Sequence, residues 1–136
     1  MIHKTAGGVL FNKTATKVYL IYKTERDEWL LPKSHVEDEQ LVDTAKRELY
    51  EETGYHSLVI SPAVTTTQFV MPNGETKNMT IFAAIAYGKQ HKTKEMLKEG
   101  LIGEWMTVRQ ALRKAKYDNI KESIRLARKQ IKKITD

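Results

Sequence analysis

Residues 39–55 read EQLVDTAKRELYEETGY, and this stretch carries most of the information about fold and chemistry. Glu48, Glu51 and Glu52 stand at positions i, i+3 and i+4, directly behind Arg47. On an α-helix, residues three and four apart share one side. Gly54 follows two residues after the last glutamate and is typical of the residue just beyond a helix end. The stretch therefore predicts a helix from near Glu39 to Gly54 with three carboxylates on one side.

The same helix has an apolar stripe, to which two of the acids are adjacent. The stripe consists of Leu41, Val42, Ala45 and Leu49. Glu52 falls inside its edge, and Glu48 lies just beside it. An ionised carboxylate is costly to bury unless it is paired, protonated or bound to metal. Several glutamate oxygens suit Mg²⁺, and Mn²⁺ accepts the same ligands, so the pattern predicts a divalent cation site.

The simpler alternative is a solvated helix face, on which Arg47 and Glu51 form an ordinary i, i+4 ion pair. Zinc is not indicated by the spacing. The chain has no cysteine and four scattered histidines, which give no tetrahedral set of nitrogen and sulfur ligands.

The larger pattern resembles the Nudix hydrolase signature, G-x5-E-x7-R-E-U-x-E-E-x-G-U, where U is apolar. The matching residues are Glu39, Arg47, Glu48, Leu49, Glu51, Glu52, Gly54 and Tyr55. The resemblance implies a mixed α/β fold, an α/β/α sandwich around a mixed β-sheet, formed by a single domain over residues 1–136. It also implies Mg²⁺-dependent hydrolysis of a nucleoside diphosphate linked to another moiety, in which metal ions neutralise charge as water attacks phosphorus.

The chain departs from this signature upstream of the helix. Residues 31–38 read LPKSHVED, so Ser34 replaces the signature glycine and one residue is missing before Glu39. In the family the carbonyl of that glycine helps to ligate metal, and Ser34 is expected to adopt a backbone geometry usually given to glycine. The departure leaves a second hypothesis open, a nucleotide-binding module that keeps the fold with weakened catalysis.

The resemblance also implies roles for individual residues. Glu48, Glu51, Glu52 and the Ser34 carbonyl are the expected metal ligands. Glu52 or a distal glutamate orients or deprotonates the attacking water, Arg47 positions the neighbouring carboxylates, and Glu39 supports them. The distal candidate is Glu99, in a stretch that resembles MutT-type enzymes, with Glu104 and Glu95 as alternatives.

Substrate contacts are expected from two groups of residues. Lys33 and His35 precede the helix, where they would contact phosphate oxygens unless they face solvent. Candidates for the base pocket are Trp29, Tyr22, Phe69 and Asn119. The alternative is that the three aromatic residues are core residues and that Asn119, with Glu122, caps a helix.

The substrate itself stays open. The position of Asn119 resembles MutT-type enzymes, which favours ordinary or modified nucleoside triphosphates, whereas the LPKxHVE pattern resembles diadenosine polyphosphate hydrolases. An ADP-ribose-like substrate is a further alternative. A small-molecule nucleotide is thus the expected partner, and the oligomeric state is not predicted.

Composition and charge limit the classes of protein to which the chain can belong. A chain with 40% hydrophobic and 29% charged residues is typical of a globular protein. Residues 1–11 lack the pattern of an export signal and no apolar run is long enough to span a membrane, so we expect a cytoplasmic protein without a membrane partner. The total charge is +6, of which residues 109–136 carry +7 and the rest −1.

This basic C-terminal segment reads as an amphipathic helix. Its apolar residues Ile120, Ile124, Ala127, Ile131 and Ile134 recur at helical spacing and would face the core, with Lys and Arg outward. A solvated face explains the charge. Contact with nucleic acid, including action on an RNA 5′ end, is the third hypothesis and predicts strong salt dependence.

Strand patterns complete the expected fold. Strands are expected at residues 4–11, 18–23, 29–31, 55–61, 64–71, 77–87 and 101–106, with a hairpin turn at 72–75. Thr107 and Gln110 form a capping-box pattern, which predicts a short helix before the basic one.

Overall fold

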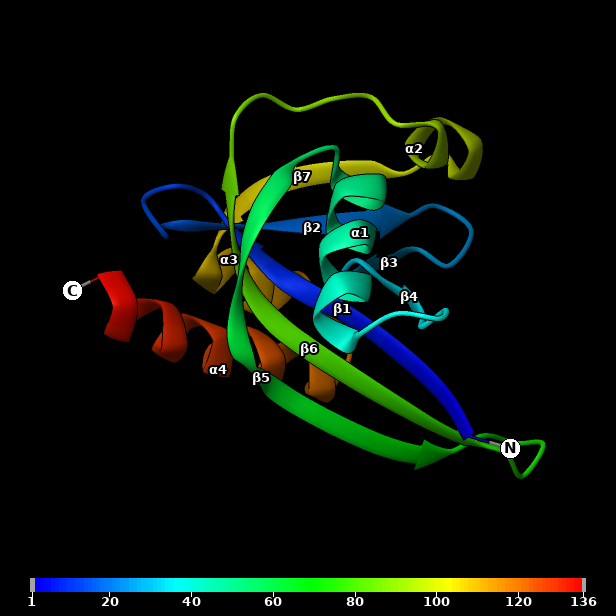
Figure 1. Ribbon diagram of the computed structural model, residues 1–136. Helices are drawn as coiled ribbons and strands as arrows, with labels where there is room; N and C mark the ends of the chain where they lie inside the picture. Colours follow the sequence, from blue (N-terminus) through cyan, green and yellow to red (C-terminus); the bar gives the residue numbers. More distant parts are fainter. Residues whose placement is uncertain (1, 136) are drawn as a thin grey trace.

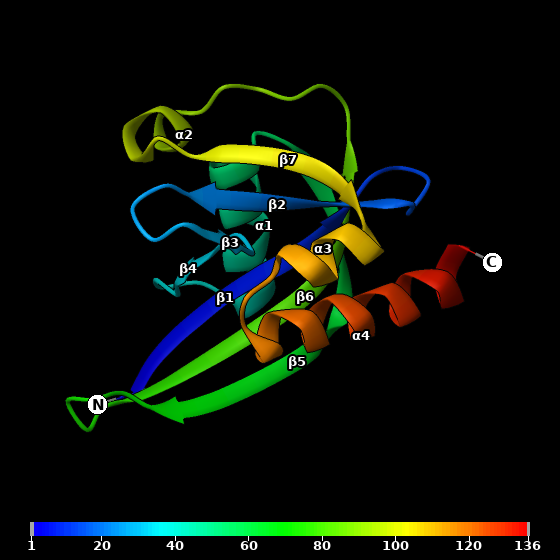
Figure 2. The same ribbon diagram turned by 180° about the vertical axis from the view of Figure 1, so that it is seen from behind.

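The computed structural model describes residues 2–135 as a mixed β-sheet with helices on both faces (Figures 1 and 2). The elements follow the order β1 (Ile2–Phe11), β2 (Lys17–Lys23), β3 (Glu28–Leu30), β4 (Lys33–His35), α1 (Leu41–Thr53), β5 (His56–Val70), β6 (Thr76–Tyr87), α2 (Lys94–Glu99), β7 (Ile102–Thr107), α3 (Val108–Lys114) and α4 (Asp118–Thr135). The predicted sandwich is confirmed.

The sheet has the strand order β3-β2-β1-β6-β5, with β4 paired to β1 and β7 paired to β2. β1 and β6 are parallel, and the other pairs are antiparallel. Because β1 pairs with β2, β4 and β6, it brings the β4 segment next to the middle of the sheet. This position places β4 beside the carboxylates of α1.

Side chains alternate between the two faces of the sheet, as a strand period of two requires. Val18 and Leu20 of β2 belong to the larger core, under α3 and α4. Tyr19 and Ile21 belong to a smaller cluster that includes Leu49 of α1. Figure 1 shows α1 on one face of the sheet, and Figure 2 shows α3 and α4 on the other. The strand expected at residues 18–23 thus contributes alternate side chains to the two clusters.

Two glycines allow segments to approach β1 and α1 closely. A Cβ atom at Gly7 would lie 2.0 Å from the Pro32 carbonyl oxygen and 2.5 Å from the Lys33 Cβ atom. Gly54 has a φ of +79°, and a Cβ atom there would lie 1.9 Å from the His91 carbonyl oxygen. Both contacts require the absence of a side chain, and both lie next to the candidate site.

Several boundaries differ from the sequence expectations. The two strands expected at residues 55–61 and 64–71 form one strand, β5, because a register shift between Ile60 and Thr65 absorbs the irregularity around Pro62. α1 begins at Leu41 rather than near Glu39. Residues 94–99, for which no element was expected, form α2.

The last three predicted features concern the C-terminal third and the hairpin turn. The capping box of Thr107 and Gln110 is present at the start of α3. The turn at residues 72–75 is confirmed by a hydrogen bond of 2.7 Å from the Met71 nitrogen to the Glu75 oxygen. In α4, Ile120, Ile124, Ala127 and Ile131 are buried as predicted, but Ile134, one residue before the end of the helix, is exposed.

Candidate active site

The predicted carboxylate helix lies with its acidic side against the core. Glu48 is 5% exposed and Glu52 is 8% exposed, although both are charged residue types. Ala45 and Leu49 of the predicted stripe are fully buried, whereas Leu41 is exposed at the first turn. The solvated-face alternative therefore does not describe Glu48 and Glu52, although its i, i+4 ion pair of Arg47 and Glu51 is present at 3.3 Å.

Burial changes the acidity of these groups. Desolvation, with a further contribution from the Glu51 charge, raises the pKa of Glu48 to about 7. Desolvation and then the charge of Glu48 raise the pKa of Glu52 to about 8. Because the two carboxylates are buried and would repel each other when ionised, they retain protons near neutral pH. A divalent cation bound to their oxygens would stabilise the ionised form.

Arg47 links the carboxylates from the side. Its Nη1 atom lies 2.8 Å from Glu48 Oε1 and 3.3 Å from Glu51 Oε2, and its Nη2 atom lies 2.7 Å from Glu39 Oε1. Hydrogen bonding to Glu39 raises the pKa of Arg47 further and lowers that of Glu39. Glu39 also accepts a hydrogen bond of 2.9 Å from the Thr44 hydroxyl. Neither Arg47 nor Glu39 lines the cavity described below, so both are placed to act through the other carboxylates.

The segment before α1 contacts the same carboxylates. The backbone N–H of Lys33 donates to Glu52 Oε1 at 2.9 Å. Ser34 pairs with Ala6 within the β4–β1 ladder. Among the described residues, the non-glycine residues with positive φ are Ala15 and Asp27, so the expectation of a glycine-like geometry at Ser34 is wrong. Ser34 is compatible with the site because it belongs to an extended strand.

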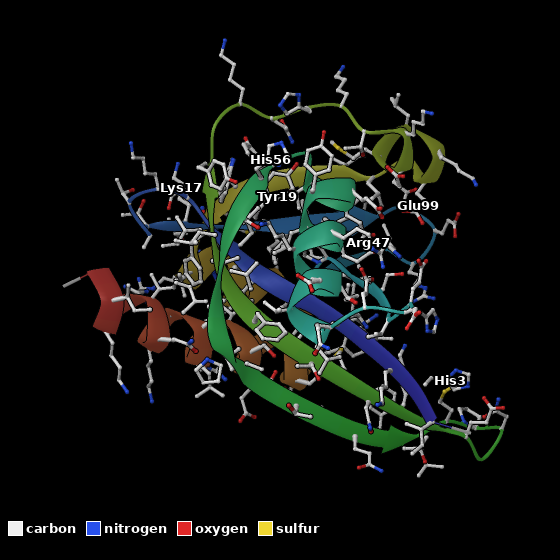
Figure 3. The ribbon with its side chains drawn as sticks, in the orientation of Figure 1. His3, Lys17, Tyr19, Arg47, His56 and Glu99 are labelled. Carbon is white, nitrogen blue, oxygen red and sulfur yellow. The ribbon has the colours of Figure 1, made fainter. Side chains whose placement is uncertain are left out.

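The distal glutamate is brought close by a segment that crosses the end of α1. His91 N–H donates to the Gly54 carbonyl at 2.8 Å, and Gln90 Nε2 donates to the Thr53 carbonyl at 2.8 Å. The Thr93 hydroxyl, which caps α2, donates to the Glu51 carbonyl. These bonds satisfy carbonyls that a helix end leaves free, and they fix α2 beside α1. In Figure 3, Glu99 at the end of α2 and Arg47 lie on the same side of α1.

A cavity of about 740 Å³ joins these groups. The acidic residues that line it are Glu48, Glu51, Glu52, Glu95 and Glu99. The charge of Glu99 also contributes to the raised pKa of Glu52, which places the two carboxylates within electrostatic reach. Glu104, the other alternative, is exposed on β7 and is not in the lining.

The structure brings five of the predicted ligand and substrate residues to this cavity in addition to the acids: Lys33, Ser34, His35, Phe69 and Asn119. Asn119 lies inside the first turn of α4, which begins at Asp118. Trp29 and Tyr22 are not brought to it. Trp29 packs against the larger core, 5.1 Å from the Tyr22 ring, and the Tyr22 hydroxyl donates to Asp27.

Another group of residues lines the cavity that no local sequence pattern predicts. Lys23 ends β2, Arg26 lies in the turn that follows it, Lys77 lies near the start of β6, and Tyr117 lies just before α4. Each has a residue type that is common on protein surfaces, and only the fold shows that they share a cavity. An alignment to a related structure is the signal that would have found them.

The donor set fits a divalent cation. Hard carboxylate oxygens from α1 lie at a deep, partly apolar cavity. Among the described residues no three acidic or histidine side chains already form a ligand cluster. Instead, Arg47 engages Glu48 and Glu51, and Glu52 accepts the Lys33 N–H. A cation would compete with these protein contacts for the same oxygens.

Comparisons with known proteins agree with this arrangement. The NUDIX domain model matches residues 1–127. The mRNA-decapping enzyme subunit 2 of Saccharomyces cerevisiae is 32% identical over 77 residues, which are 56% of this chain but only 8% of the yeast protein. No helix among the described residues has the length and apolarity that a membrane crossing requires.

Solved structures show the same fold. The Ap4A hydrolase of C. elegans in a binary complex has a TM-score of 0.79 at 19% identity, with 96% of this chain and 98% of that chain covered. A NUDIX hydrolase from Nitrosomonas europaea has a TM-score of 0.77 at 18% identity, with 96% and 90% covered. The MutT protein from Methanosarcina mazei has a TM-score of 0.71 at 17% identity, with 95% of each chain covered. With a matching domain model over nearly all its residues, the chain belongs to the Nudix hydrolase family.

Proposed function

We propose that this protein is a Mg²⁺-dependent pyrophosphohydrolase that cleaves a nucleoside diphosphate linked to another moiety. The observation that carries the proposal is that one cavity is lined by Glu48, Glu51 and Glu52 of α1 and by Glu99 of α2. Lys33 and His35 line the same cavity. Anionic groups for a cation and cationic groups for phosphate thus lie around one space, as hydrolysis of a phosphoric anhydride requires.

The ions and residues have separable roles in this proposal. Glu48, Glu51, Glu52 and the Ser34 carbonyl would hold the divalent cation, Mg²⁺ or Mn²⁺, which supplies charge neutralisation at the phosphates and acidifies bound water. Glu99 takes the proton of the attacking water, with Glu52 as the alternative base. Lys33 and His35 bind phosphate oxygens, and Arg47 with Glu39 fixes the orientation of the carboxylates.

The nucleoside end of the cavity is formed by Phe69 and Asn119. Phe69 is partly exposed and offers a ring face for stacking, and Asn119 carries an amide that can both donate and accept hydrogen bonds. Apolar residues from the larger core, including Met79 and Ile81, form the floor between them. Such a mixture suits a planar base.

The direct test is a substrate panel with product identification. Diadenosine tetraphosphate, ADP-ribose and ordinary and oxidised dGTP are incubated with Mg²⁺ or Mn²⁺, and both products are identified. The proposal expects cleavage within the anhydride of at least one substrate, abolished by EDTA. Binding of these nucleotides with no product from any of them would instead favour the nucleotide-binding module.

A second candidate function is favoured by the relation to the yeast decapping subunit, which suggests a capped RNA 5′ end as substrate. The exposed basic residues of α4, such as Arg125, Arg128 and Lys129, would bind the RNA backbone. Release of the cap nucleotide from a short capped RNA, at rates above those on the free cap dinucleotide, would support this function. Equal rates on both would assign the activity to small nucleotides.

The raised pKa values predict how stability depends on pH without metal. Burial raises the pKa of Glu52 to about 8 and that of Glu48 to about 7, from an ordinary value of 4.5. The folded protein therefore retains protons that the unfolded chain releases, so stability falls as the pH rises from about 5 to about 8. We expect the Tm in EDTA to fall over this interval, measured by circular dichroism.

Added metal should oppose the fall of Tm with rising pH, because a cation replaces the protons that Glu48 and Glu52 retain. The rise in Tm on adding Mg²⁺ is expected to be larger at about pH 8 than at about pH 6, where protons compete with the cation. Glu52→Gln should flatten the pH dependence measured in EDTA. A Mg²⁺-induced Tm shift that is equal at both pH values would contradict this account.

A further inference from the structure

Four cationic side chains line the cavity beside its carboxylates but form no ion pair with them. They are Lys23, Arg26, Lys33 and Lys77. Across residues 2–135, Arg47 and His3 form the ion pairs, all with glutamates, and none of the four cavity cations forms such a pair. Lys77 has a weaker contact, with its Nζ atom 6.0 Å from the centre of the Phe69 ring.

These cations come from separate parts of the fold but act on one another. Lys23 ends β2, Arg26 lies in the turn after it, Lys33 begins β4 and Lys77 lies near the start of β6. All four line one cavity, where their charges repel one another. The carboxylates of the same cavity offset part of this repulsion, but none of them forms an ion pair with the four cations. An anionic ligand would remove the repulsion.

The cationic group extends from the carboxylate end of the cavity to the base end. At one end, the Lys33 backbone N–H donates to Glu52 Oε1 at 2.9 Å. At the other, the charge of Arg26 acts on Tyr117, whose hydroxyl donates to Glu28. Lys77 of β6 is paired with Phe69 of the neighbouring strand β5. A ligand bound by all of them must therefore carry negative charge along most of the cavity.

We propose that Lys23, Arg26 and Lys77 bind phosphates beyond the cleaved diphosphate, so that the preferred substrates are nucleotides with a chain of three or more phosphates. This inference rests on the proposed function and deepens it. A diphosphate bridge, as in ADP-ribose, brings about two negative charges and can be contacted by the cation at α1 and by Lys33. Three further cations offer contacts to additional phosphates. In this inference, Lys23, Arg26 and Lys77 determine the preferred number of phosphates and take no part in the chemical step.

The test uses diadenosine di-, tri-, tetra- and pentaphosphate, which share both nucleosides and differ in phosphate number. Binding is measured by isothermal titration calorimetry in EDTA, so that neither metal nor turnover contributes. We expect the tetraphosphate to bind the natural protein at least about tenfold more tightly than the diphosphate, because each additional phosphate gains charge-assisted hydrogen bonds. In Lys23→Gln/Lys77→Gln, this ratio should fall to below about threefold, with binding of the diphosphate little changed.

The matched control is Lys89→Gln/Lys129→Gln, which removes the same charge from exposed positions outside the cavity. It should retain the length preference. Single variants serve if circular dichroism shows that the double variant is unfolded. Equal affinity for the diphosphate and the tetraphosphate in the natural protein, or a length preference that survives in the cavity variants, would overturn the inference.

The same series separates this inference from the proposed function. Length-dependent binding without any hydrolysis in Mg²⁺ or Mn²⁺ would support the inference and refute the pyrophosphohydrolase. Hydrolysis of all four compounds with equal kcat/KM, together with equal affinities, would support the pyrophosphohydrolase and refute the inference.

Discussion

Replacement of Glu52 by glutamine is expected to lower kcat at least about a hundredfold while the protein stays folded. The amide removes the negative charge that a divalent cation needs but keeps the size of the side chain. Its carbonyl oxygen can still accept the hydrogen bond of 2.9 Å that the Lys33 N–H donates to Glu52 Oε1. Because the buried Glu52 carboxyl has a pKa of about 8, the neutral amide also resembles its state in the metal-free protein at neutral pH.

Steady-state kinetics on the best substrate of the panel measure this effect, and the Tm in EDTA verifies folding. Glu104→Gln is the matched control, because Glu104 is an exposed glutamate on β7 outside the cavity. It should retain natural activity. Natural rates in the Glu52 variant would show that this carboxylate takes no part in the reaction. Glu51→Gln offers a second variant at a less buried position, with the same expectation.

Replacement of Arg47 by alanine is expected to lower kcat by about tenfold to a hundredfold, the range for residues that orient metal ligands. The guanidinium contacts Glu39, Glu48 and Glu51, so its loss leaves three carboxylates without the group that holds them. Since Arg47 does not line the cavity, KM should change much less than kcat. Arg47→Lys retains the charge but lacks the planar guanidinium, so its kcat should lie between those of the natural protein and Arg47→Ala.

The pH profile distinguishes positioning from a general loss of structure. The charge of Arg47 lowers the pKa of Glu48, so its removal should raise that pKa and move the rising limb of the pH–rate profile to higher pH. Arg128→Ala, at an exposed position on α4, is the control and should leave the profile in place. A reduced rate with an unshifted profile would refute the proposed electrostatic role.

The sequence predicted the parts of the fold that rest on local patterns. The spacing of Glu48 and Glu52 relative to Ala45 and Leu49 predicted that the two acids border the core, and both are buried. Gly54 ends α1 in the left-handed conformation, as its position indicated. The capping box at Thr107 and the alternation of side chains in β2 were likewise readable, because each depends on residues a few positions apart.

What the sequence did not predict depends on contacts between distant segments. α2 is held by hydrogen bonds from Gln90, His91 and Thr93 to the end of α1, and no local periodicity marks this docking. Ser34 avoids a glycine-like geometry because β4 pairs with β1. Lys23 and Lys77 line the same cavity only because the sheet brings β2 and β6 together. Trp29 has a side chain suited to stacking on a base, but it packs against the larger core.

The central claim is that the carboxylates of α1 bind a divalent cation at the cavity where the diphosphate is cleaved. Anomalous diffraction from crystals of the protein soaked with Mn²⁺ and a non-hydrolysable nucleotide tests it most directly. The account predicts an anomalous peak about 2.0–2.3 Å from oxygens of Glu51 and Glu52, with a phosphate oxygen in the same coordination sphere. Mn²⁺ bound elsewhere, or a nucleotide in the cavity with no metal beside these glutamates, would contradict it.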